Sequence, residues 1–585
     1  MARVFYDGQR IFVDVARLDE QKVSSLAEYY GAEYFVEFDC YAFNRNANAI
    51  MDIAKLEGAL FDPSFEDLYK RIKVVYDRKI EQRQEEIKAL NLPECLYPFQ
   101  KEAVCDMLKS TRNILLASDP GCGKTAMSLL YLSKREISYP ALIVCPASLK
   151  VNWSVEVSKW TPDKSVYIIY GRDSYNDDYV ISQAQKADII IINYDILGID
   201  DKEASKREKE RIKIAKENGW KYRKAFVPVK GWAVVFNEQF RLKTIVCDEC
   251  QYIESSKAIR TRAVIQISTN ENIKKVFLSG TPFETRVAQF YNACHLLAPD
   301  LFPKESDFLW RYCGPKHNGF GWEYKGLSNV EELRYLLSQF MIRHKKEDVL
   351  KQLPPKQKIP IYFDMDKNSR ITYDQMEEEL MAQEEGIHQF SYLSKMREAL
   401  VDIKLDAIIQ FIKDMLEVED KLVVFVYHER MYNDLMKIFE GQCTGINGNV
   451  PPEKRQDKVD MFQQDSKIKL FIGQIQAAST GITLTASHTV IFTEWGLTVS
   501  QMEQACDRIH RIGQESDRCL IYYLVVKDTI DEDPIANLGS HYADIEAVLN
   551  GNKNAEFVDL DSLMIAKVKQ RKLMNKKKGV NIEYE

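Results

Sequence analysis

The most informative stretch of the sequence is Ala117-Ser118-Asp119-Pro120-Gly121-Cys122-Gly123-Lys124-Thr125. A short apolar run over residues 114–116 precedes it, and a helical pattern over residues 126–132 follows. A strand, a glycine turn and a helix N-terminus together bind phosphate, because backbone N–H groups and the positive end of the helix dipole converge on the anion. The stretch therefore predicts a nucleoside triphosphate site. The alternative is a chance glycine turn before a helix.

Lys124 is expected to reach the β- and γ-phosphates, and the Thr125 hydroxyl is expected to bind Mg²⁺. Ser118 stands where the usual pattern has its first glycine. The residues expected to contact the nucleotide here are Asp119, Gly121, Cys122, Gly123, Lys124, Thr125 and Ala126.

Composition and charge are those of an ordinary globular protein. The 585 residues predict roughly three or four domains. A net charge of −7 means that any nucleic-acid contact is local. The twelve cysteines lie scattered in apolar segments, which favours a reducing compartment. Cys247 and Cys250 lack the further ligands that a structural zinc site needs.

No apolar run is long enough to span a bilayer, and the N-terminus does not have the pattern of a signal peptide. We therefore expect no membrane contact and a cytoplasmic protein, in a bacterial or virus-infected cell, or a nuclear one if the source is eukaryotic. We also expect a monomer.

Residues 1–90 predict a small α+β domain, with a hairpin around Asp7-Gly8, a helix over 18–30, a strand over 34–38 and a charged helix over 64–88. Two groups of short apolar runs follow. The first comprises residues 114–117, 141–145, 189–192, 244–247 and 275–278, and the second 422–426, 469–472, 490–492 and 520–526.

Unbroken β-branched runs of this kind indicate parallel strands that are covered on both faces. The sequence therefore predicts an α/β fold with two parallel-sheet lobes, over 91–344 and 401–548, joined by a helical linker over 345–400. A basic tail, 549–585, ends the chain.

Two basic stretches stand apart. Residues 201–232 interleave lysines and arginines with Trp220, Tyr222 and Trp232, and the stretch from Ile565 to Lys578 holds seven Lys or Arg and no acid. A solvated helix or a disordered tail is the default for such runs. DNA contact is the alternative, because basic residues with aromatic ones serve phosphates and bases alike.

Catalytic groups are expected at the carboxyl ends of the strands, where parallel sheets bind ligands. Asp248 follows an apolar run and is expected to hold Mg²⁺ as the acidic partner of Thr125. Glu249 is expected to orient and deprotonate the attacking water; helix capping is the alternative for this pair. Residues 279–282 follow the next run and offer small hydroxyls that could couple the lobes.

Phosphoryl transfer needs further positive charge, and Arg508 and Arg511 can supply it. An arginine from a facing surface contributes about 10³–10⁵ in rate. Three residues apart on a helix, both would lie on one face. Two surface arginines on a solvated helix would be the default without the phosphate loop.

The stretch from Gln504 to Gln514, with its Arg-Ile-His-Arg-Ile-Gly-Gln core, resembles motif VI of the Swi/Snf-type DNA translocases of helicase superfamily two. Further segments resemble that family's motifs in order: 97–100 (adenine-reading), 145–149 with Trp153 and Trp160 (Ia), 248–251 (II), 279–282 (III) and 478–484 (V). The resemblance covers residues 95–545.

This resemblance implies two RecA-like lobes, with ATP and Mg²⁺ as cofactors. It places Gln100 on the adenine base and Gly481 and Gln504 beside the nucleotide. The catalytic residues that it implies are Lys124, Asp248, Glu249, Arg508 and Arg511, and its metal ligands are Thr125 and Asp248.

Within the family, residues 308–313, 319–324, 341–350 and 353–356 look like those of the HepA-related annealing helicases that act at stalled forks. Residues 38–44 are similar to part of their DNA-binding accessory domain. The resemblance implies duplex, forked or branched DNA as partner, bound without sequence preference.

The sequence departs from the family at Gln251, where motif II usually ends in His, and at Trp495-Gly496-Leu497, where the family has Trp-Asn-Pro. The first departure affects coupling more than hydrolysis. We expect an ATP-driven DNA translocase that remodels or re-anneals branched DNA. The alternatives are a conventional helicase or restriction-system motor, and an ATP-gated DNA-binding clamp with little turnover.

Overall fold

The structure is a computed structural model that describes residues 3–14, 20–30, 32–35, 40–56, 59–220, 226–283, 286–317, 319, 321–324, 326–382, 387–478, 481–496, 499–532 and 548. The chain forms two compact units, Met1–Tyr97 and Pro98–Glu585. The predictions made for Tyr222, Ser479, Thr480, Leu497 and the tail 549–585 lie outside the described residues.

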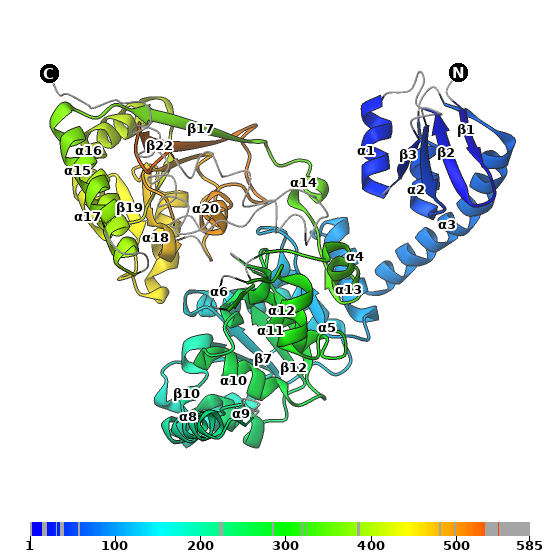
Figure 1. Cartoon of the computed structure of the whole chain (residues 1–585), viewed down its shortest axis with the longest axis horizontal. Helices are drawn as coiled ribbons and strands as arrows, with labels where there is room; N and C mark the ends of the chain where they lie inside the picture. The colour runs from blue at the N-terminus through cyan, green and yellow to red at the C-terminus, as the bar shows by residue number, and fades with distance from the viewer. Residues whose placement is uncertain are drawn as a thin grey trace. The chain divides into compact units, whose positions relative to one another are not determined.

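The first unit is the predicted small α+β domain (Figure 1). Its elements are β1 (Arg3–Tyr6), β2 (Arg10–Asp14), α1 (Glu20–Tyr30), β3 (Glu33–Phe35), β4 (Cys40–Asn44), α2 (Ala47–Ile53), β5 (Leu60–Phe61) and α3 (Pro63–Ala89). The strand order is β3-β4-β2-β1-β5, and the hairpin at Asp7-Gly8 is confirmed. The Asp7 carboxylate accepts the backbone N–H groups of Gln9 and Arg10, which fixes that turn.

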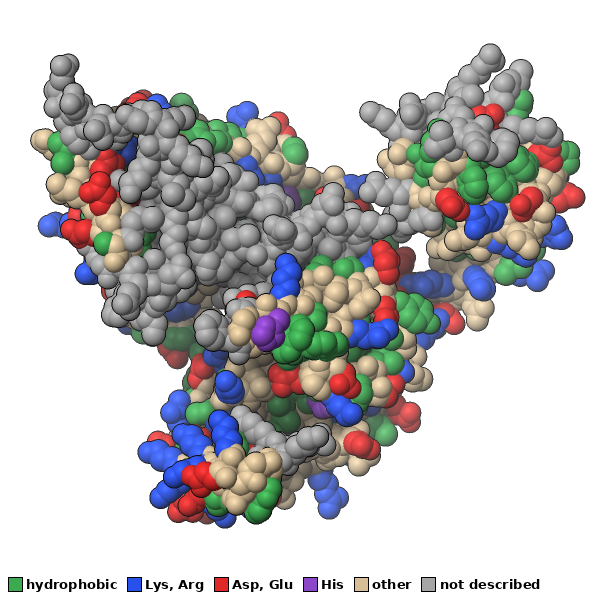
Figure 2. All heavy atoms as spheres, in the orientation of Figure 1, with side chains coloured by type: hydrophobic (Ala, Val, Ile, Leu, Met, Phe, Trp, Pro, Cys, Tyr) green, Lys and Arg blue, Asp and Glu red, His purple; other side chains and the backbone are tan. Residues whose placement is uncertain are grey.

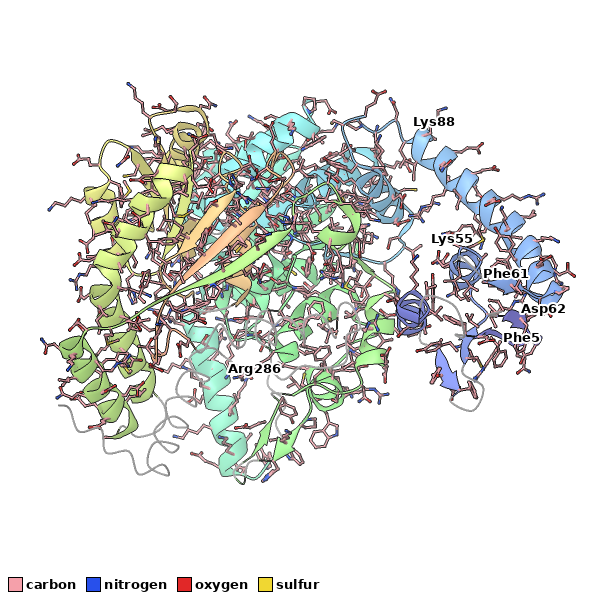
Figure 3. The ribbon with its side chains drawn as sticks, turned by 90° about the horizontal axis from the view of Figure 1, so that it is seen from above. Phe5, Lys55, Phe61, Asp62, Lys88 and Arg286 are labelled. Carbon is pink, nitrogen blue, oxygen red and sulfur yellow. The ribbon has the colours of Figure 1, made fainter. Side chains whose placement is uncertain are left out.

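One face of this sheet packs on its helices around Val4, Ile11 and Phe43, which are fully buried with Phe65 of α3. The 27 residues of α3 begin behind Asp62, whose carboxylate accepts the N–H of Ser64, and Pro63 occupies the first turn. Figure 3 labels Asp62 and Lys88 at the two ends of this helix.

Lobe 1 is built on a seven-stranded sheet in the order β16-β6-β13-β12-β7-β9-β8. Its strands are β6 (Ile114–Leu116), β7 (Ala141–Cys145), β8 (Val166–Ile168), β9 (Ile189–Asn193), β12 (Thr244–Asp248), β13 (Lys274–Leu278) and β16 (Met341–Ile342). Every pairing in it is parallel, and the five predicted apolar runs form its five central strands.

Helices cover both faces of the lobe 1 sheet, which is why its central strands are buried residue by residue. The helices are α4 (Pro98–Lys109), α5 (Lys124–Lys134), α6 (Lys150–Trp160), α7 (Asp178–Lys186), α9 (Trp232–Gln239), α10 (Ile259–Ser268), α11 (Tyr291–Leu297), α12 (Glu305–Tyr312), α13 (Val330–Leu337) and α14 (Lys346–Val349). The predicted basic insertion is α8 (Lys202–Glu217), beside the short pair β10 (Ile199–Asp200) and β11 (Val229–Lys230). A second short pair joins β14 (Lys316–His317) to β15 (Trp322–Glu323).

Lobe 2 has a six-stranded parallel sheet in the order β17-β22-β21-β18-β20-β19. Its elements are β17 (Lys356–Phe363), α15 (Lys367–Ala382), α16 (Ile387–Val418), β18 (Leu422–Val426), α17 (Glu429–Ile438), β19 (Cys443–Ile446), α18 (Pro452–Gln464), β20 (Leu470–Gln474), α19 (Ile475–Ala478), β21 (Thr489–Phe492), α20 (Val499–Cys506) and β22 (Cys519–Val526). Helices α16 and α17 pack on one face, and α18 and α20 on the other.

The two RecA-like parallel sheets confirm the predicted fold class. The region 345–400, expected as a helical linker, also contains β17, which pairs with β22 along eight residues (Figure 1). Half of the side chains of β17 are exposed, and its sequence includes three polar residues and Pro360, so it lacks the apolar run that marks a central strand. Among the described residues, no helix is long and apolar enough to cross a membrane.

Candidate active site

The phosphate loop, residues 117–123, joins the end of β6 to the start of α5. Gly121 and Gly123 have φ of +86° and +84°, a region that glycine enters without a steric penalty. A Cβ on Gly123 would lie 2.4 Å from Nε2 of Gln100, so a larger residue here would displace the Gln100 amide. The loop therefore has the backbone that an anion cradle needs.

Lys124 is the first residue of α5, and its ammonium lies back over the loop. Its Nζ donates to the carbonyl oxygen of Ser118 at 2.9 Å and lies 3.4 Å from that of Asp119. Thr125 follows in the same turn and is partly exposed. Both residues directly follow the loop, where phosphate and Mg²⁺ were predicted.

Gln100 lies in α4 and is buried behind the phosphate loop. Its Nε2 donates to the carbonyl oxygen of Cys122 at 3.0 Å. Burial raises the pKa of the Cys122 thiol to about 11, so Cys122 stays neutral in the loop. Gln100 thus braces the loop; its contact with adenine stays a prediction.

Residues 343–346, which directly follow β16, hold the other side of the loop. Arg343 donates to the carbonyl of Ala117 at 2.6 Å and lies 3.2 Å from the Asp119 carboxylate. The His344 ring lies 2.9 Å from the Ser118 hydroxyl, and the backbone N–H of Lys346 donates to Asp119 at 2.9 Å. No pattern in the sequence predicts this contact. It explains Ser118, whose hydroxyl has a partner that a glycine would lack.

Asp248 ends β12, and one strand, β13, separates β12 from β6, so the acid and the loop lie about 10 Å apart across the sheet edge. The carboxylate is buried and accepts from the Trp153 indole at 2.8 Å and from the Glu249 N–H at 3.0 Å. Burial and then the charge of Glu249 raise the pKa of Asp248 to about 7. A cation placed beside this carboxylate would lower that pKa again.

Glu249 has φ of +50°, which sets its side chain off from the line of β12. Its carboxylate accepts from Gln251 Nε2 at 2.9 Å, and Gln251 Oε1 accepts from the Ser279 hydroxyl at 2.7 Å. The side-chain amide of Gln251 therefore joins motif II, through Glu249, to motif III, through Ser279. A Cβ on Gly280 would meet Pro120 at 2.6 Å, so motif III also touches the phosphate loop.

The described residues fit a bound Mg²⁺, although they hold no group of three or more metal-ligating side chains. Mg²⁺ is normally bound through one or two protein groups, water and phosphate oxygens. The partly exposed Thr125 hydroxyl and the Asp248 carboxylate, with its raised pKa, are a donor set of that kind.

In lobe 2, helix α20 ends at Cys506, so Arg508 and Arg511 lie in the turn that follows it and not on a shared helical face. They converge nonetheless. Both guanidinium groups donate to the carbonyl of Ile482, at 3.3 Å and 3.1 Å, and Arg511 donates to the Thr483 hydroxyl at 2.9 Å. Burial lowers the pKa of Arg508 to about 10, helped by the charge of Arg511. Both remain cations at neutral pH.

The two lobes meet at the phosphate loop. A Cβ on Gly121 would lie 3.6 Å from Cγ of Arg511, so the arginine chain passes directly over the loop. The backbone carbonyl of the buried Gln504 anchors Arg508 at 2.8 Å. Gly481 contacts lobe 1, because a Cβ there would lie 2.3 Å from Leu149 of motif Ia.

The structure therefore brings together the loop, Arg511 and motif III, and it holds Asp248 and Glu249 at the same sheet edge. Gly481 stands apart, against motif Ia. Sequence reasoning noted residues 341–350 and Trp153 only as part of the family resemblance, and it did not predict that 343–346 holds the phosphate loop or that Trp153 donates to Asp248.

Two parallel α/β lobes that share a phosphate loop, an acidic pair and two arginines define the class of two-lobe, nucleotide-driven motors. The SNF2-related domain family matches residues 99–414, and the Helicase conserved C-terminal domain family matches residues 403–513. The chain belongs to the SNF2 family of DNA-dependent ATPases.

Two relatives are similar over most of this chain. It is 29% identical to the DNA annealing helicase and endonuclease ZRANB3 of Homo sapiens over 474 residues, which cover 78% of this chain and 41% of that protein. It is 30% identical to the SWI/SNF-related matrix-associated actin-dependent regulator of chromatin subfamily A-like protein 1 of Xenopus laevis, over 75% of this chain and 42% of that protein. The chain thus spans less than half the length of either relative.

Among solved structures, the chain is similar to the Sulfolobus solfataricus SWI2/SNF2 ATPase core in complex with dsDNA. The TM-score is 0.36 at 22% sequence identity, over 83% of this chain and 97% of that chain.

Proposed function

We propose that this chain hydrolyses ATP to move along duplex DNA and so remodels or re-anneals forked or branched DNA. The observation that carries the proposal is the meeting of two half-sites, with Arg511 of lobe 2 over Gly121 of lobe 1. A site divided in this way can open and close with the nucleotide state, and closure can shift one lobe along a strand. The relative that is named a DNA annealing helicase supports re-annealing, and the choice of forked DNA rests on the resemblance to the HepA-related annealing helicases.

In this proposal, Lys124 holds the β- and γ-phosphates and Glu249 orients and deprotonates the attacking water. Arg508 and Arg511 neutralise the charge that develops at the γ-phosphate. Thr125 and Asp248 hold Mg²⁺, which supplies charge neutralisation on the phosphate oxygens.

Contact with DNA is proposed to run through phosphates, from motifs Ia, III and V, and therefore to be independent of sequence and sensitive to salt. Helix α8 adds a candidate contact, since Figure 2 shows many exposed Lys and Arg side chains, with acidic ones among them, in its region. Five exposed lysines recur there at helical spacing: Lys202, Lys206, Lys209, Lys213 and Lys216.

The first unit is proposed as a DNA-binding accessory domain. On the sheet face opposite its core, Phe5 stacks on Phe12 at 5.0 Å between ring centroids, and Phe35 lies 6.3 Å from Phe12. Phe5, labelled in Figure 3, is 39% exposed. Exposed aromatic rings on an open sheet offer a stacking surface for unpaired bases, of the kind that a fork presents.

The test compares ATP hydrolysis on single-stranded, duplex and forked DNA. We expect stimulation by duplex and most by forked DNA, with displacement of a triple-helix strand and re-annealing of separated strands. Processive strand separation would favour the conventional helicase or restriction-system motor instead. Absence of any DNA-stimulated hydrolysis would leave the ATP-gated clamp.

Three single variants test the assigned roles in the same assay. Lys124→Ala, Glu249→Gln and Arg511→Ala are each expected to abolish turnover, because each removes a charge or base that acts on the reacting phosphate. DNA binding at low salt should stay close to that of the unmodified chain. Turnover that survives Glu249→Gln would exclude Glu249 as the base.

A further inference from the structure

Lys346 is the first residue of α14 and contacts both halves of the divided site. Its backbone N–H donates to the carboxylate of Asp119 in the phosphate loop at 2.9 Å. Its Nζ donates to the Asp507 carboxylate at 2.6 Å and to the carbonyl of His510 at 3.0 Å. The side chain is only 8% exposed, so these contacts form with little competition from water.

Asp507 and His510 stand on either side of Arg508 and directly before Arg511 in the chain. The Lys346 ammonium therefore holds the backbone turn that carries both arginines. Burial alone would raise the pKa of Asp507, but the charges of Lys346 and Lys356 lower it well below its usual range. Asp507 is thus ionised, and its carboxylate pairs with the Lys346 ammonium.

The Lys346 side chain also passes close to the loop itself. A Cβ on Gly121 would lie 3.4 Å from both Cε and Nζ of Lys346 and 3.6 Å from Cγ of Arg511. One residue therefore touches the loop at Asp119 and beside Gly121, and touches motif VI at Asp507 and His510. These contacts give a path by which a shift of the loop on binding phosphate would reach Lys346.

A second lysine nearby serves as an internal comparison. Lys356 is the first residue of β17. Its Nζ lies 3.3 Å from the carboxylate of Asp507 and 3.0 Å from that of Glu503. It lines the same cavity of about 830 Å³ as Lys346. These two ion pairs tie Lys356 to α20 and motif VI, whereas the contacts of Lys346 join motif VI to the phosphate loop.

We propose that Lys346 is a positioning residue that transmits the state of the phosphate loop to motif VI and so places Arg508 and Arg511 for hydrolysis. The inference goes beyond the proposed function, and it rests on the proposed role of the two arginines. Lys346 itself touches no reacting atom in this proposal. It acts through Asp507 and His510.

The experiment compares Lys346→Met with Lys356→Met in steady-state, DNA-stimulated ATP hydrolysis. Methionine keeps the length of the lysine stem and removes the charge. Displacing a catalytic group by about 1 Å costs about 10²-fold in rate, so kcat of Lys346→Met should fall by that order. KM for ATP should change little, because Lys124 and the loop glycines are intact. Lys356→Met removes a cation from the same carboxylate and should keep kcat.

Lys346→Arg tests whether the charge is what matters, and it should recover part of the lost kcat. Asp507→Asn should lower kcat like Lys346→Met, and the double variant should be no worse than either single one, because both changes break the same link. Thermal unfolding of each variant, followed in parallel, identifies any that fail to fold.

Three results would overturn the inference. The first is an unchanged kcat in a folded Lys346→Met chain, and the second is an equal loss in Lys356→Met, which would mean that Lys346 only neutralises Asp507. The third is full additivity in the double variant. Arg511→Ala, measured alongside, separates the two proposals: if it retains turnover, the proposed arginine role fails too, and if it abolishes turnover while Lys346→Met does not, only the inference fails.

Discussion

Gln251 links the acidic pair to motif III through two hydrogen bonds of one side-chain amide. Its Nε2 donates to Glu249, and its Oε1 accepts from Ser279. The bond from Gln251 Nε2 holds one oxygen of the Glu249 carboxylate in place. The bond from the Ser279 hydroxyl to Gln251 Oε1 ties this side chain to the end of β13, the strand next to β6 and the phosphate loop. An imidazole has one donor and one acceptor as well, so the family His could make the same link.

We therefore predict that Gln251→His keeps most of the turnover, and that Gln251→Ala lowers kcat by about 10- to 100-fold, because general-base catalysis depends on a held carboxylate. KM for ATP should stay nearly constant in both variants, since neither touches the phosphate loop. Steady-state kinetics on duplex DNA measure this. A Gln251→Ala chain with normal kcat would show that Glu249 is held by other groups.

Asp248 makes stability depend on pH in a defined window. Its pKa is raised to about 7 in the folded chain, from 3.8, so between these values the folded chain keeps a proton that the unfolded chain releases. Stability from this group therefore falls as pH rises from about 4 to about 7, and it stays low above that range.

Asp248→Asn removes this ionisation and should raise the melting temperature at pH 8 in magnesium-free buffer. The full ionisation cost is about 4 kcal/mol, and Asn loses one of two N–H···O bonds, worth about 1–3 kcal/mol, so a net gain of about 1–3 kcal/mol is expected. The gain should shrink as the pH is lowered towards 4. Melting curves of both chains across pH 4–8 measure it, and a gap that does not depend on pH would contradict the raised pKa.

In the two lobes, sequence reasoning predicted the central strands of the large parallel sheets and missed their edge strands. The strands that it missed, β8 and β16 in lobe 1 and β17 and β19 in lobe 2, are the four edge strands of the two sheets. A central strand is covered on both faces and flanked on both sides, so it shows as an unbroken apolar run. Each missed strand lacks such a run for its own reason: β16 has two residues, β8 is only partly buried, β17 is half exposed, and β19 contains Thr444 and Gly445.

In the candidate site, too, some features could be predicted from the sequence and others could not. The phosphate loop, Asp248 and Glu249 could be predicted as site residues because each is local and follows an apolar run. The link from Lys346 to Asp507 joins residues 161 positions apart, and nothing in either segment alone points to the other. Contacts of that kind depend on how the lobes pack, which only the folded structure provides.

The segment between α19 and β21, which holds motif V, contains the contact of Gly481 with Leu149. Gly481 has φ of +75°, and a Cβ there would stand 2.3 Å from Cδ2 of Leu149. We predict that Gly481→Ala lowers kcat on DNA, because the added methyl group pushes motif V away from motif Ia. Leu149→Ala in the same chain should restore most of the loss, since it removes the atoms that clash.

Leu149→Ala alone is the control, and it should keep kcat closer to normal than Gly481→Ala does. The positive φ costs alanine about 1–2 kcal/mol wherever Leu149 is, so melting temperature should fall in both variants that carry Gly481→Ala. If the double variant is as slow as Gly481→Ala, backbone strain and not the lobe contact is responsible.

For the whole chain, the division into two compact units separates the candidate active site from the proposed accessory domain. Every residue of the candidate active site lies beyond Pro98, and the first unit has its own core around Val4, Ile11 and Phe43. A chain of residues 91–585 should therefore keep the kcat of DNA-stimulated hydrolysis. Its affinity for forked DNA should fall, and the slope of log affinity against log salt should become shallower, because fewer DNA phosphates are neutralised without the first unit.

Substitutions in the intact chain test which residues of the first unit contribute to the affinity for forked DNA. Phe5→Ala with Phe12→Ala removes the stacked pair, and base stacking is worth about 1–3 kcal/mol per base, so fork affinity should fall by about 10-fold or more. Val74→Ala with Val75→Ala, two exposed apolar residues on α3, is the matched control and should leave affinity unchanged. Fluorescence anisotropy on forked and plain duplex DNA of equal length measures both pairs. Equal affinity of the shortened and full chains for forked DNA would remove the accessory domain from the proposed function, because only a binding role makes the two chains differ.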